Sequence, residues 1–299
     1  MGLKANVGEE PVGAVDTLGV APASDGAVCL RPRGALAARL GDCVAYQERI
    51  GHPVRRREIP ASRVVMIVAL GDPIELVHAP GGGARGRLGC FVAGPHDAMA
   101  VTGLRGAQRG LHLTLSPARA YSIFGLPMHL LSNTFVDLAA VLGRDGALLP
   151  ERMAEAPTWQ ARFEILAAFL DRRIAAGPEP DPAVEWALRR LRATGGGIRI
   201  QALADRLGWS RRHLVRRFHE QVGLSPKTMA RVLRFERATA LLADGSRPIA
   251  RVAADAGYAD QAHLSREIRA LARCAPREYA ASLRRSAPDL PVMSHFFNS

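Results

Sequence analysis

The last hundred residues of the chain contain one helical pattern twice, and this repeat limits the possible folds more than any other feature. Three stretches return at nearly the same offset, 49 or 50 positions later: "LADRLGW" (203–209) as "VAADAGY" (252–258), "HLVRRF" (213–218) as "HLSREI" (263–268), and "GLSPKTM" (223–229) as "RCAPREY" (273–279). Recurrence at a fixed offset indicates a repeated supersecondary unit. The sequence therefore predicts two copies of one helical motif.

Each copy has the layout of a helix-turn-helix. In the first copy, residues 200–207 place apolar side chains on one face of a short helix, and Gly208 can adopt the positive φ that ends it. Ser210 can then cap a second helix by accepting a hydrogen bond from a free backbone N–H. Leu214 and Phe218 lie one turn apart on that helix and are expected to face inward. In the second copy, residues 249–268 repeat this layout, with Asp260 as the cap.

The second helix of each copy leaves a set of side chains facing outward. In a helix-turn-helix, the N-terminal half of this recognition helix meets base edges in the major groove. Arginine can bond O6 and N7 of guanine together, and glutamine can bond adenine. We therefore predict nine DNA-binding residues: Ser210, Arg211, Arg212, Val215 and Arg216 in the first copy, and Gln261, Ala262, Ser265 and Arg266 in the second.

A long helix is predicted between the two copies. Ser225 can cap it, Pro226 suits its first turn, and Gly245 stops it. Its 19 residues would span about 28 Å at about 1.5 Å per residue. Adjacent major grooves on one face of DNA lie about 34 Å apart. A stiff connector of this length could place both recognition helices in successive grooves.

The positive charge of the chain is concentrated in this same region. Residues 182–285 hold 21 Lys and Arg against 9 Asp and Glu, and the rest of the chain holds 19 of each. The whole net charge of +12 therefore belongs to the repeat region. Such an asymmetry indicates a polyanionic partner for one part of the chain.

At these residues the chain resembles the AraC/XylS family of transcription regulators, over residues 181–285. The matching residues are Ile200, Leu203, Ala204, Gly208, His213, Leu214, Arg216, Phe218, Gly223, Ser225, Pro226, Arg234, Ala238, Leu241, Leu242, Ile249, Val252, Ala253, Gly257, Tyr258, Arg266 and Pro276. The resemblance implies a seven-helix DNA-binding domain with two helix-turn-helices that acts on bacterial promoters, usually alongside RNA polymerase. The base-reading positions of the family fall on predicted residues of both copies.

The chain departs from the family pattern in the second copy. Arg273 stands where the family usually has glycine, Ala275 where it has threonine or serine, and Ile268 where it has phenylalanine. These departures concern the packing and capping of the last helices.

The neutral part of the chain is predicted to be a β-rich domain. Short apolar segments alternate with turn signals: 43–50, 63–70, 73–79, 87–94, 98–104 and 110–116. The expected fold class is α+β, with a small β-barrel or sandwich and helices at residues 41–175, a linker at 176–182 and an all-α domain at 183–285. Residues 1–40 are expected to be a flexible arm, and residues 286–299 a flexible tail.

One helix of this part, expected near residues 158–174, carries an apolar stripe: Trp159, Phe163, Leu166, Leu170 and Ile174. We expect the stripe to pack against its own domain, and a homodimer seam is the alternative. In the resembling family an N-terminal β-barrel often senses a small molecule or pairs subunits, so an effector and a homodimer are both open partners. The sequence names no effector-binding residue.

The neutral part lacks the motifs of an enzyme. Its histidines, His52, His78, His96, His112 and His129, are isolated in the sequence, with no His-x-His or His-Glu-x-x-His motif. We therefore expect no metal, no cofactor and no catalytic residues. The glycine-rich 81–89 lacks the residues of a phosphate loop, and a turn is expected there. Cys43 and Cys90 are expected to be buried thiols, with a redox sensor as the alternative.

The favoured interpretation is a sequence-specific regulator that binds double-stranded promoter or operator DNA. The alternatives are a cupin-like enzyme or a small-molecule-binding protein that carries a basic C-terminal module. Basic helices on an anionic membrane are disfavoured, because membrane-surface helices need a broad apolar face. No apolar run reaches the ~20 residues of a membrane span, and no signal peptide is visible, so we expect a cytoplasmic, nucleoid-associated protein.

Overall fold

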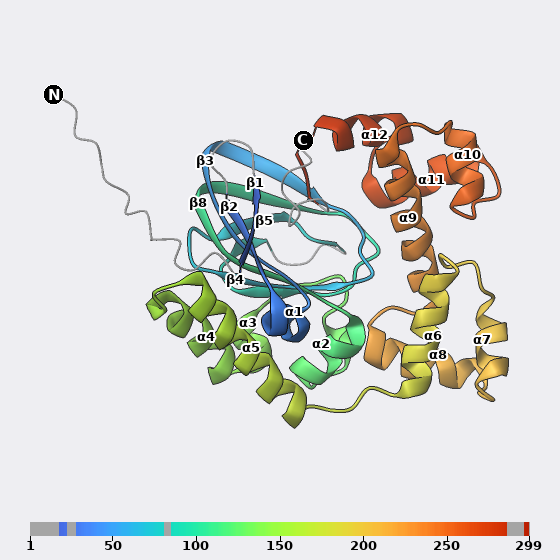
Figure 1. The fold of residues 1–299 in the computed structure, drawn as a ribbon. Coiled ribbons are helices and arrows are strands. Elements are labelled where there is room, and N and C mark those ends of the chain that lie inside the picture. Colours follow the sequence, from blue (N-terminus) through green and yellow to red (C-terminus); the bar gives the residue numbers. More distant parts are fainter. Residues whose placement is uncertain (1–17, 23–27, 81–84, 286–295, 299) are drawn as a thin grey trace.

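The computed structural model describes residues 18–22, 28–80, 85–285 and 296–298 (Figure 1). The N-terminal part contains an antiparallel 10-stranded sheet rolled into an open barrel, with helices along one side. The strands are β1 (Leu18–Pro22), β2 (Val28–Pro32), β3 (Asp42–Glu58), β4 (Val64–Ala69), β5 (Ile74–His78), β6 (Gly86–Leu88), β7 (Phe91–Ala93), β8 (Ala100–Leu115), β9 (Phe135–Asp137) and β10 (Phe296–Asn298). The helices of this part are α1 (Gly34–Leu40), α2 (Pro117–Phe124), the short 3-10 helix η3 (Met128–Leu130), α3 (Leu138–Leu142), α4 (Arg144–Glu155) and α5 (Trp159–Ala176).

Two long strands organise the barrel. β3 and β8 pair from Asp42↔Thr114 to Glu58↔Ala100, with an irregularity between Ile50 and Val54. The main path through the sheet runs β1-β2-β3-β8-β4-β7-β9, and β5, β6 and β10 attach at its sides. Because side chains alternate across a strand, one face of β3 and β8 lines the barrel interior and the other faces outward.

Helices α1, α2 and α5 cover one side of the barrel and close its main core (Figure 1). Phe163, Leu166 and Leu170 of α5 are fully buried in this core, and Ile174 is about one-third exposed. The apolar stripe of α5 therefore packs within its own domain, as expected from the sequence. Phe163, Leu166 and Leu170 are therefore not available to a dimer seam.

Several boundaries differ from the sequence-based expectation. Residues 28–40 are not an arm: β2 pairs with β3, and α1 packs Leu36 and Leu40 into the core. The expected strands 98–104 and 110–116 are parts of the single strand β8, and the expected strand 87–94 is divided between β6 and β7. Residues 296–298 pair with β3 instead of trailing as a tail. Residues 1–17, 23–27, 81–84, 286–295 and 299 lie outside the described part of the chain.

The C-terminal part consists of seven helices in two lobes (Figure 1). They are α6 (Pro182–Ala193), α7 (Ile200–Arg206), α8 (Arg211–Val222), α9 (Pro226–Asp244), α10 (Ile249–Asp255), α11 (Gln261–Ala272) and α12 (Pro276–Arg285). Residues 177–181, within the predicted linker 176–182, lie between α5 and α6. The seven-helix arrangement implied by the family resemblance is present, and α7–α8 and α10–α11 are the two predicted helix-turn-helices.

Helix α9 has the bounds that the sequence predicted. The Ser225 hydroxyl accepts a hydrogen bond from the Thr228 N–H at 3.1 Å, and Gly245 ends the helix in the left-handed conformation. Val232 and Leu233 belong to the core of the first lobe, whereas Phe235 belongs to the core of the second. The single helix α9 therefore contributes side chains to the cores of both lobes.

The departure at Arg273 has a structural consequence. Arg273 ends α11 with a left-handed φ of 57°, while Gly223, its counterpart in the first lobe, ends α8 with a φ of 96°. A side chain in the left-handed region costs roughly 1–2 kcal/mol, and glycine there avoids the clash of Cβ with the backbone.

We expect Arg273→Gly to raise the free energy of unfolding by about 0.5–1 kcal/mol, because glycine also loses more backbone entropy on folding. The measurement is the urea midpoint of unfolding. Arg269→Gly is the matched control: the same change inside the last turn of α11 should destabilise by about 1 kcal/mol. Loss of stability in both variants would contradict the account of Arg273.

Candidate functional site

The second helices of the two helix-turn-helices, α8 and α11, bury the same positions. Leu214 and Phe218 of α8 are fully buried, and so are their counterparts Leu264 and Ile268 of α11. The nine positions from residue 211 and from residue 261 have the same sequence of exposed, half-buried and buried classes. The two copies of the sequence repeat therefore expose and bury corresponding positions of α8 and α11.

Each of these helices begins at a side-chain cap. The Ser210 hydroxyl accepts a hydrogen bond from the His213 N–H at 3.1 Å, and the Asp260 carboxylate accepts one from the His263 N–H at 2.6 Å. An aromatic ring lies edge-on to each histidine: Trp209 at 4.5 Å and Tyr258 at 5.2 Å between ring centroids. The cap and the ring fix the start of each helix and the direction of its first turn.

All nine predicted DNA-binding residues lie on the accessible side of the two helices. Val215 and Ser265 are half-buried and the other seven are exposed: Ser210, Arg211, Arg212, Arg216, Gln261, Ala262 and Arg266. The five residues of the first copy lie together, because they line one shallow surface hollow with His213. The four residues of the second copy lie on α11, in the other lobe. The sequence prediction missed His213, whose ring Nδ1 is 3.5 Å from Nη2 of Arg216.

The arginines of α8 divide into two groups. Arg217 makes ion pairs with Asp181 at 3.3 Å and with Glu220 at 2.9 Å. Within the described residues, no ion pair involves Arg211, Arg212 or Arg216. Three cationic groups at the start of α8 are therefore available to an anionic partner.

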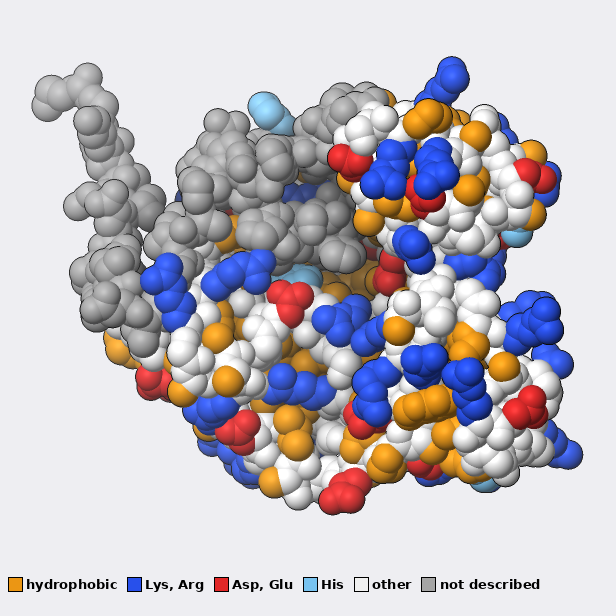
Figure 2. All heavy atoms as spheres, turned by 45° about the vertical axis from the view of Figure 1, so that its right-hand side comes forward, with side chains coloured by type: hydrophobic (Ala, Val, Ile, Leu, Met, Phe, Trp, Pro, Cys, Tyr) orange, Lys and Arg blue, Asp and Glu red, His pale blue; other side chains and the backbone are white. Residues whose placement is uncertain are grey.

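Positive charge also extends beyond α8. Figure 2 shows Lys and Arg side chains over both lobes of the C-terminal part on the face that comes forward in that view. Between the lobes, Arg231 of α9 holds Glu267 of α11 through two hydrogen bonds, of 2.7 and 3.2 Å. This bidentate pair fixes α11 relative to α9.

The barrel contacts both lobes of the C-terminal part. Toward the first lobe, His129 of η3 stacks on His219 of α8, with ring centroids 4.9 Å apart. Toward the second lobe, Ile59 at the end of β3 packs among core residues of α9–α12. The N–H and hydroxyl of Ser62 donate to the two carboxylate oxygens of Glu236 on α9, at 2.7 and 3.0 Å. The β3–β4 connection is thus joined directly to the helix between the lobes.

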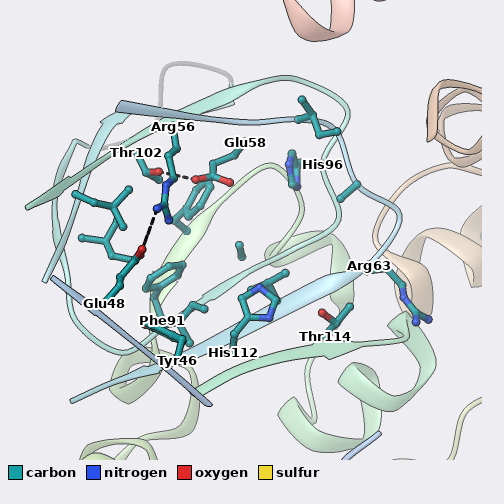
Figure 3. Close-up of a pocket in the computed structure, with 18 residues that line it drawn as sticks. Tyr46, Glu48, Arg56, Glu58, Arg63, Phe91, His96, Thr102, His112 and Thr114 are labelled. Atoms are coloured by element: carbon teal, nitrogen blue, oxygen red, sulfur yellow. Dashed lines mark hydrogen bonds and ion pairs between the residues drawn. The ribbon is translucent and has the colours of Figure 1, made fainter. Parts of the chain in front are cut away.

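The same connection forms part of the wall of a cavity inside the barrel (Figure 3). Ile59, Ala61 and Arg63 line the cavity, as do apolar side chains that include Ile67 and Phe91. The centres of water-sized molecules have about 90 Å³ available to them there. Roughly 10–15 Å³ by this measure is enough for one water, so the cavity has room for a small organic molecule.

One end of the cavity carries ionisable side chains (Figure 3). Nη2 of Arg56 lies 3.2 Å from Oε1 of Glu48, and both side chains are largely buried. On the same strand, Oε1 of Glu58 accepts a hydrogen bond of 2.5 Å from the Thr102 hydroxyl of β8. Burial raises the pKa of Glu58 to about 8, although the Thr102 hydrogen bond and the charge of Arg56 act in the opposite direction.

Comparisons with known proteins agree with the geometry of the C-terminal part. Residues 203–282 match the family described as "Helix-turn-helix domain". The HTH-type transcriptional regulator YbfI of Bacillus subtilis (strain 168) is 32% identical over 92 residues, which are 30% of this chain and 33% of YbfI. The chain thus spans about a third of the length of this curated relative.

The C-terminal part of this chain is an AraC-type helix-turn-helix domain.

Among solved structures, the chain is similar to ToxT from Vibrio cholerae, at 12% identity over 80% of this chain and 97% of ToxT, with a TM-score of 0.48. It is also similar to the C-terminal domain of AraT from Geobacillus stearothermophilus, at 23% identity over 35% of this chain and 88% of that domain, with a TM-score of 0.33.

The AraC-type domain was visible in the sequence, but the cavity of the barrel was not. The isolated histidines His96 and His112 both reach the cavity, from different segments, and His129 reaches α8. Within the described residues no group of three or more His, Cys, Asp or Glu side chains could hold a metal ion. The signal that could have marked the cavity is the set of polar residues Tyr46, Glu48, Arg56 and Glu58, which keep the same alternation along β3 on both sides of the irregularity between Ile50 and Val54.

The two cysteines considered in the sequence, Cys43 and Cys90, differ in burial. Cys43 is buried, Cys90 is half-buried, and burial raises the pKa of the Cys90 thiol to about 11, which disfavours the reactive thiolate. The expected glycine-rich turn lies partly outside the described residues, at 81–84. None of the described helices combines the length and the apolar character that crossing a membrane requires.

Glu58 predicts a pH dependence of stability. Its pKa is about 8 in the folded chain and about 4.5 as an ordinary value, so the folded state binds more protons between these limits. Stability should therefore fall as the pH rises from about 4.5 to about 8.

The variant Glu58→Gln stays neutral at every pH. Its free energy of unfolding, relative to that of the wild type, should therefore increase across this range. Urea unfolding at several pH values measures the difference. Glu75→Gln, at an exposed position of β5, is the control; a constant difference between Glu58→Gln and wild type would contradict the assignment.

Proposed function

We propose that the protein is a transcription regulator that binds specific double-stranded DNA sequences through α8 and α11. The observation that carries the proposal is the shared facing of the two helices: both bury the same two positions and leave the predicted contact residues accessible. Arg211, Arg212 and Arg216, which make no ion pair within the described residues, would contact phosphates and guanine edges. Phosphate contacts supply much of the affinity in such complexes, and base contacts supply the specificity.

The two helices would make different contributions. Arg212 and Arg216 provide α8 with two guanidinium groups, each of which can bond O6 and N7 of guanine. Gln261 provides α11 with a side-chain amide that can bond adenine. Ala262 and Ser265 are small and permissive. We therefore propose that α8 provides the stronger and more selective contact, and that α11 extends the recognised sequence.

Helix α9 would set the distance between the two contacts. Its 19 residues correspond to about 28 Å, and the widths of the two lobes add to this length. Adjacent major grooves on one face of B-DNA lie about 34 Å apart. One chain would thus occupy two successive grooves, as a dimer does when each subunit carries one helix-turn-helix.

The N-terminal domain would regulate this binding by sensing a small molecule. The support is the position of the β3–β4 connection, which lines the barrel cavity and holds Glu236 of α9 through Ser62. A molecule in the cavity would therefore touch a segment that is fixed to the DNA-binding domain. A homodimer would need a surface other than the buried stripe of α5. The proposal assigns the chain no catalytic activity.

The family resemblance adds the setting of this function. It supports promoter or operator DNA as the target, RNA polymerase as a partner and the bacterial cytoplasm, at the nucleoid, as the location. The basic charge of residues 182–285 is consistent with a nucleic-acid partner.

In-vitro selection from random duplexes tests the proposal. The wild-type chain should recover a defined motif, and Arg216→Ala should relax the preference at one base pair and weaken binding of the preferred duplex by about 1–3 kcal/mol. The reason is that a bidentate contact to guanine discriminates against other bases, whereas a phosphate contact does not.

Arg251→Ala is the matched control for Arg216→Ala. Arg251 of α10 is 70% exposed, pairs with Asp255 and is not one of the predicted contact residues. Its loss should weaken binding of all sequences slightly and in a salt-dependent manner. Uniform weakening by Arg216→Ala would make Arg216 a phosphate contact, and recovery of no motif by the wild-type chain would overturn the proposed function.

A further inference from the structure

The polar end of the barrel cavity contains an unusual balance of charge. Three ionisable side chains of β3 meet there, two carboxyl groups and one guanidinium: Glu48, Glu58 and Arg56. From this arrangement we propose that the cavity binds a small, mostly apolar primary amine, whose ammonium group donates hydrogen bonds to Glu58. This inference rests on the proposed sensing role of the N-terminal domain and specifies the chemical class of its ligand.

Glu58 is placed to receive a hydrogen-bond donor. The residue is only 6% exposed, and its side chain projects into the cavity (Figure 3). Oε1 accepts the Thr102 hydroxyl, and within the described part of the chain no hydrogen bond reaches Oε2. Oε2 is not sealed off from the cavity, so an ammonium group can reach it and would supply both a hydrogen bond and, once Glu58 has ionised, the opposite charge.

The other charges of the cavity do not supply this partner. Arg56 is held by Glu48, with Nη2 at 3.2 and 3.4 Å from the two carboxylate oxygens. Arg63 lies at the opposite side of the cavity, toward the DNA-binding domain (Figure 3). An anionic ligand at the polar end would meet two carboxyl groups and would have to compete with Glu48 for Arg56. A cation meets Glu58, whose carboxyl group makes no ion pair within the described residues, although the nearby charge of Arg56 lowers its pKa.

The remaining walls define the body of the ligand. Apolar side chains surround most of the cavity: Ile59, Val65, Ile67, Ile74, Phe91 and Phe135. The other polar groups that face it are Tyr46 of β3, His112 and Thr114 of β8, and His96 of the β7–β8 connection. An aliphatic or aromatic body would thus be buried in hydrocarbon while the charged group reaches Glu58.

Binding of an amine should release a proton. Burial raises the pKa of Glu58 to about 8, so the carboxyl group is mostly protonated near neutral pH. An ammonium ion would enter with its own proton, Glu58 would ionise to pair with it, and the carboxyl proton would leave to solvent. Near pH 7 the release should approach about one proton per ligand, and well above pH 8 it should vanish.

Isothermal titration calorimetry on the full-length chain tests this proposal. The probes are three matched series on the same apolar bodies (cyclohexylmethyl, benzyl and phenylethyl), each as a primary amine, an alcohol and a carboxylate. At least one amine should bind, about tenfold or more tightly than its alcohol, and its carboxylate should bind more weakly than either. Buffers with different ionisation enthalpies then give the number of protons released.

Glu58→Gln separates the carboxyl group from the cavity itself. This variant should bind an amine and its alcohol with similar affinity and should release no proton, while the exposed-site control Glu75→Gln should behave as wild type. The proposal is overturned if no amine binds, if an alcohol or carboxylate binds as well as its amine, or if Glu58→Gln keeps the preference.

DNA binding is measured separately on the same samples, without ligand and with the bound amine. Amine binding by a chain that recovers no DNA motif would refute the proposed function and leave the ligand assignment intact. DNA binding by a chain that binds no amine would refute only the ligand assignment.

Discussion

Helix α9 contributes side chains to two hydrophobic cores, and the arrangement of the DNA-binding domain depends on this sharing. Val232 and Leu233 pack into the first lobe, while Phe235 and Ala238, within the next two turns, pack into the second. Burial of a large apolar side chain contributes about 1.5–3 kcal/mol, so movement of either lobe on α9 would expose surface at considerable cost. The bidentate pair of Arg231 with Glu267 adds a directional link to α11. The two recognition helices are therefore parts of one rigid unit.

The barrel is fastened to this unit at more than one place. Ile59 and Ser62 contact the second lobe and α9, while His129 and His219 stack at the first lobe. Gly223 lies in the same seam, where an added Cβ would come within 2.4 Å of the Ser132 hydroxyl; at Gly208, which has a similar positive φ, an added Cβ would meet nothing within 4 Å. The close approach at Gly223 shows that η3 and the residues after it pack tightly against the end of α8. A change in the barrel can thus reach both lobes through direct contacts.

The sequence predicted the features of the chain that depend on local chemistry. The caps Ser210, Ser225 and Asp260 and the ends of α9 follow from hydrogen bonding and backbone preference within a few residues. The outward faces of α8 and α11 follow from the helical period. The positions of these side chains were predicted correctly; their contacts with bases remain a prediction. The pairing of Arg217 with Asp181 could not be predicted in this way, because it joins residues 36 positions apart.

The barrel was less predictable, because its structure depends on long-range pairing. Nothing local to residues 98–116 indicates that β8 continues through Gly103 and Gly106 as one strand, since its continuity comes from pairing with β3. Residues 28–40 have no clear apolar period, yet β2 and α1 are ordered by contacts with β3 and α5. The cavity combines Glu48, Arg56 and Glu58 across an irregular strand with Thr102 of β8, a grouping that requires the strand register. The buried carboxyl group of Glu58 was hidden for the same reason.

Hydroxyl-radical footprinting of the chain on its selected duplex is the most direct test of the central claim, that α9 holds two recognition helices for simultaneous use. If both recognition helices bind at once, two protected segments are expected on one face of the duplex, centred about 10 base pairs apart. Substitution of Gln261 and Arg266 by alanine should weaken only one of the two segments. A single protected segment that survives these substitutions unchanged, or two segments on opposite faces of the duplex, would contradict the account.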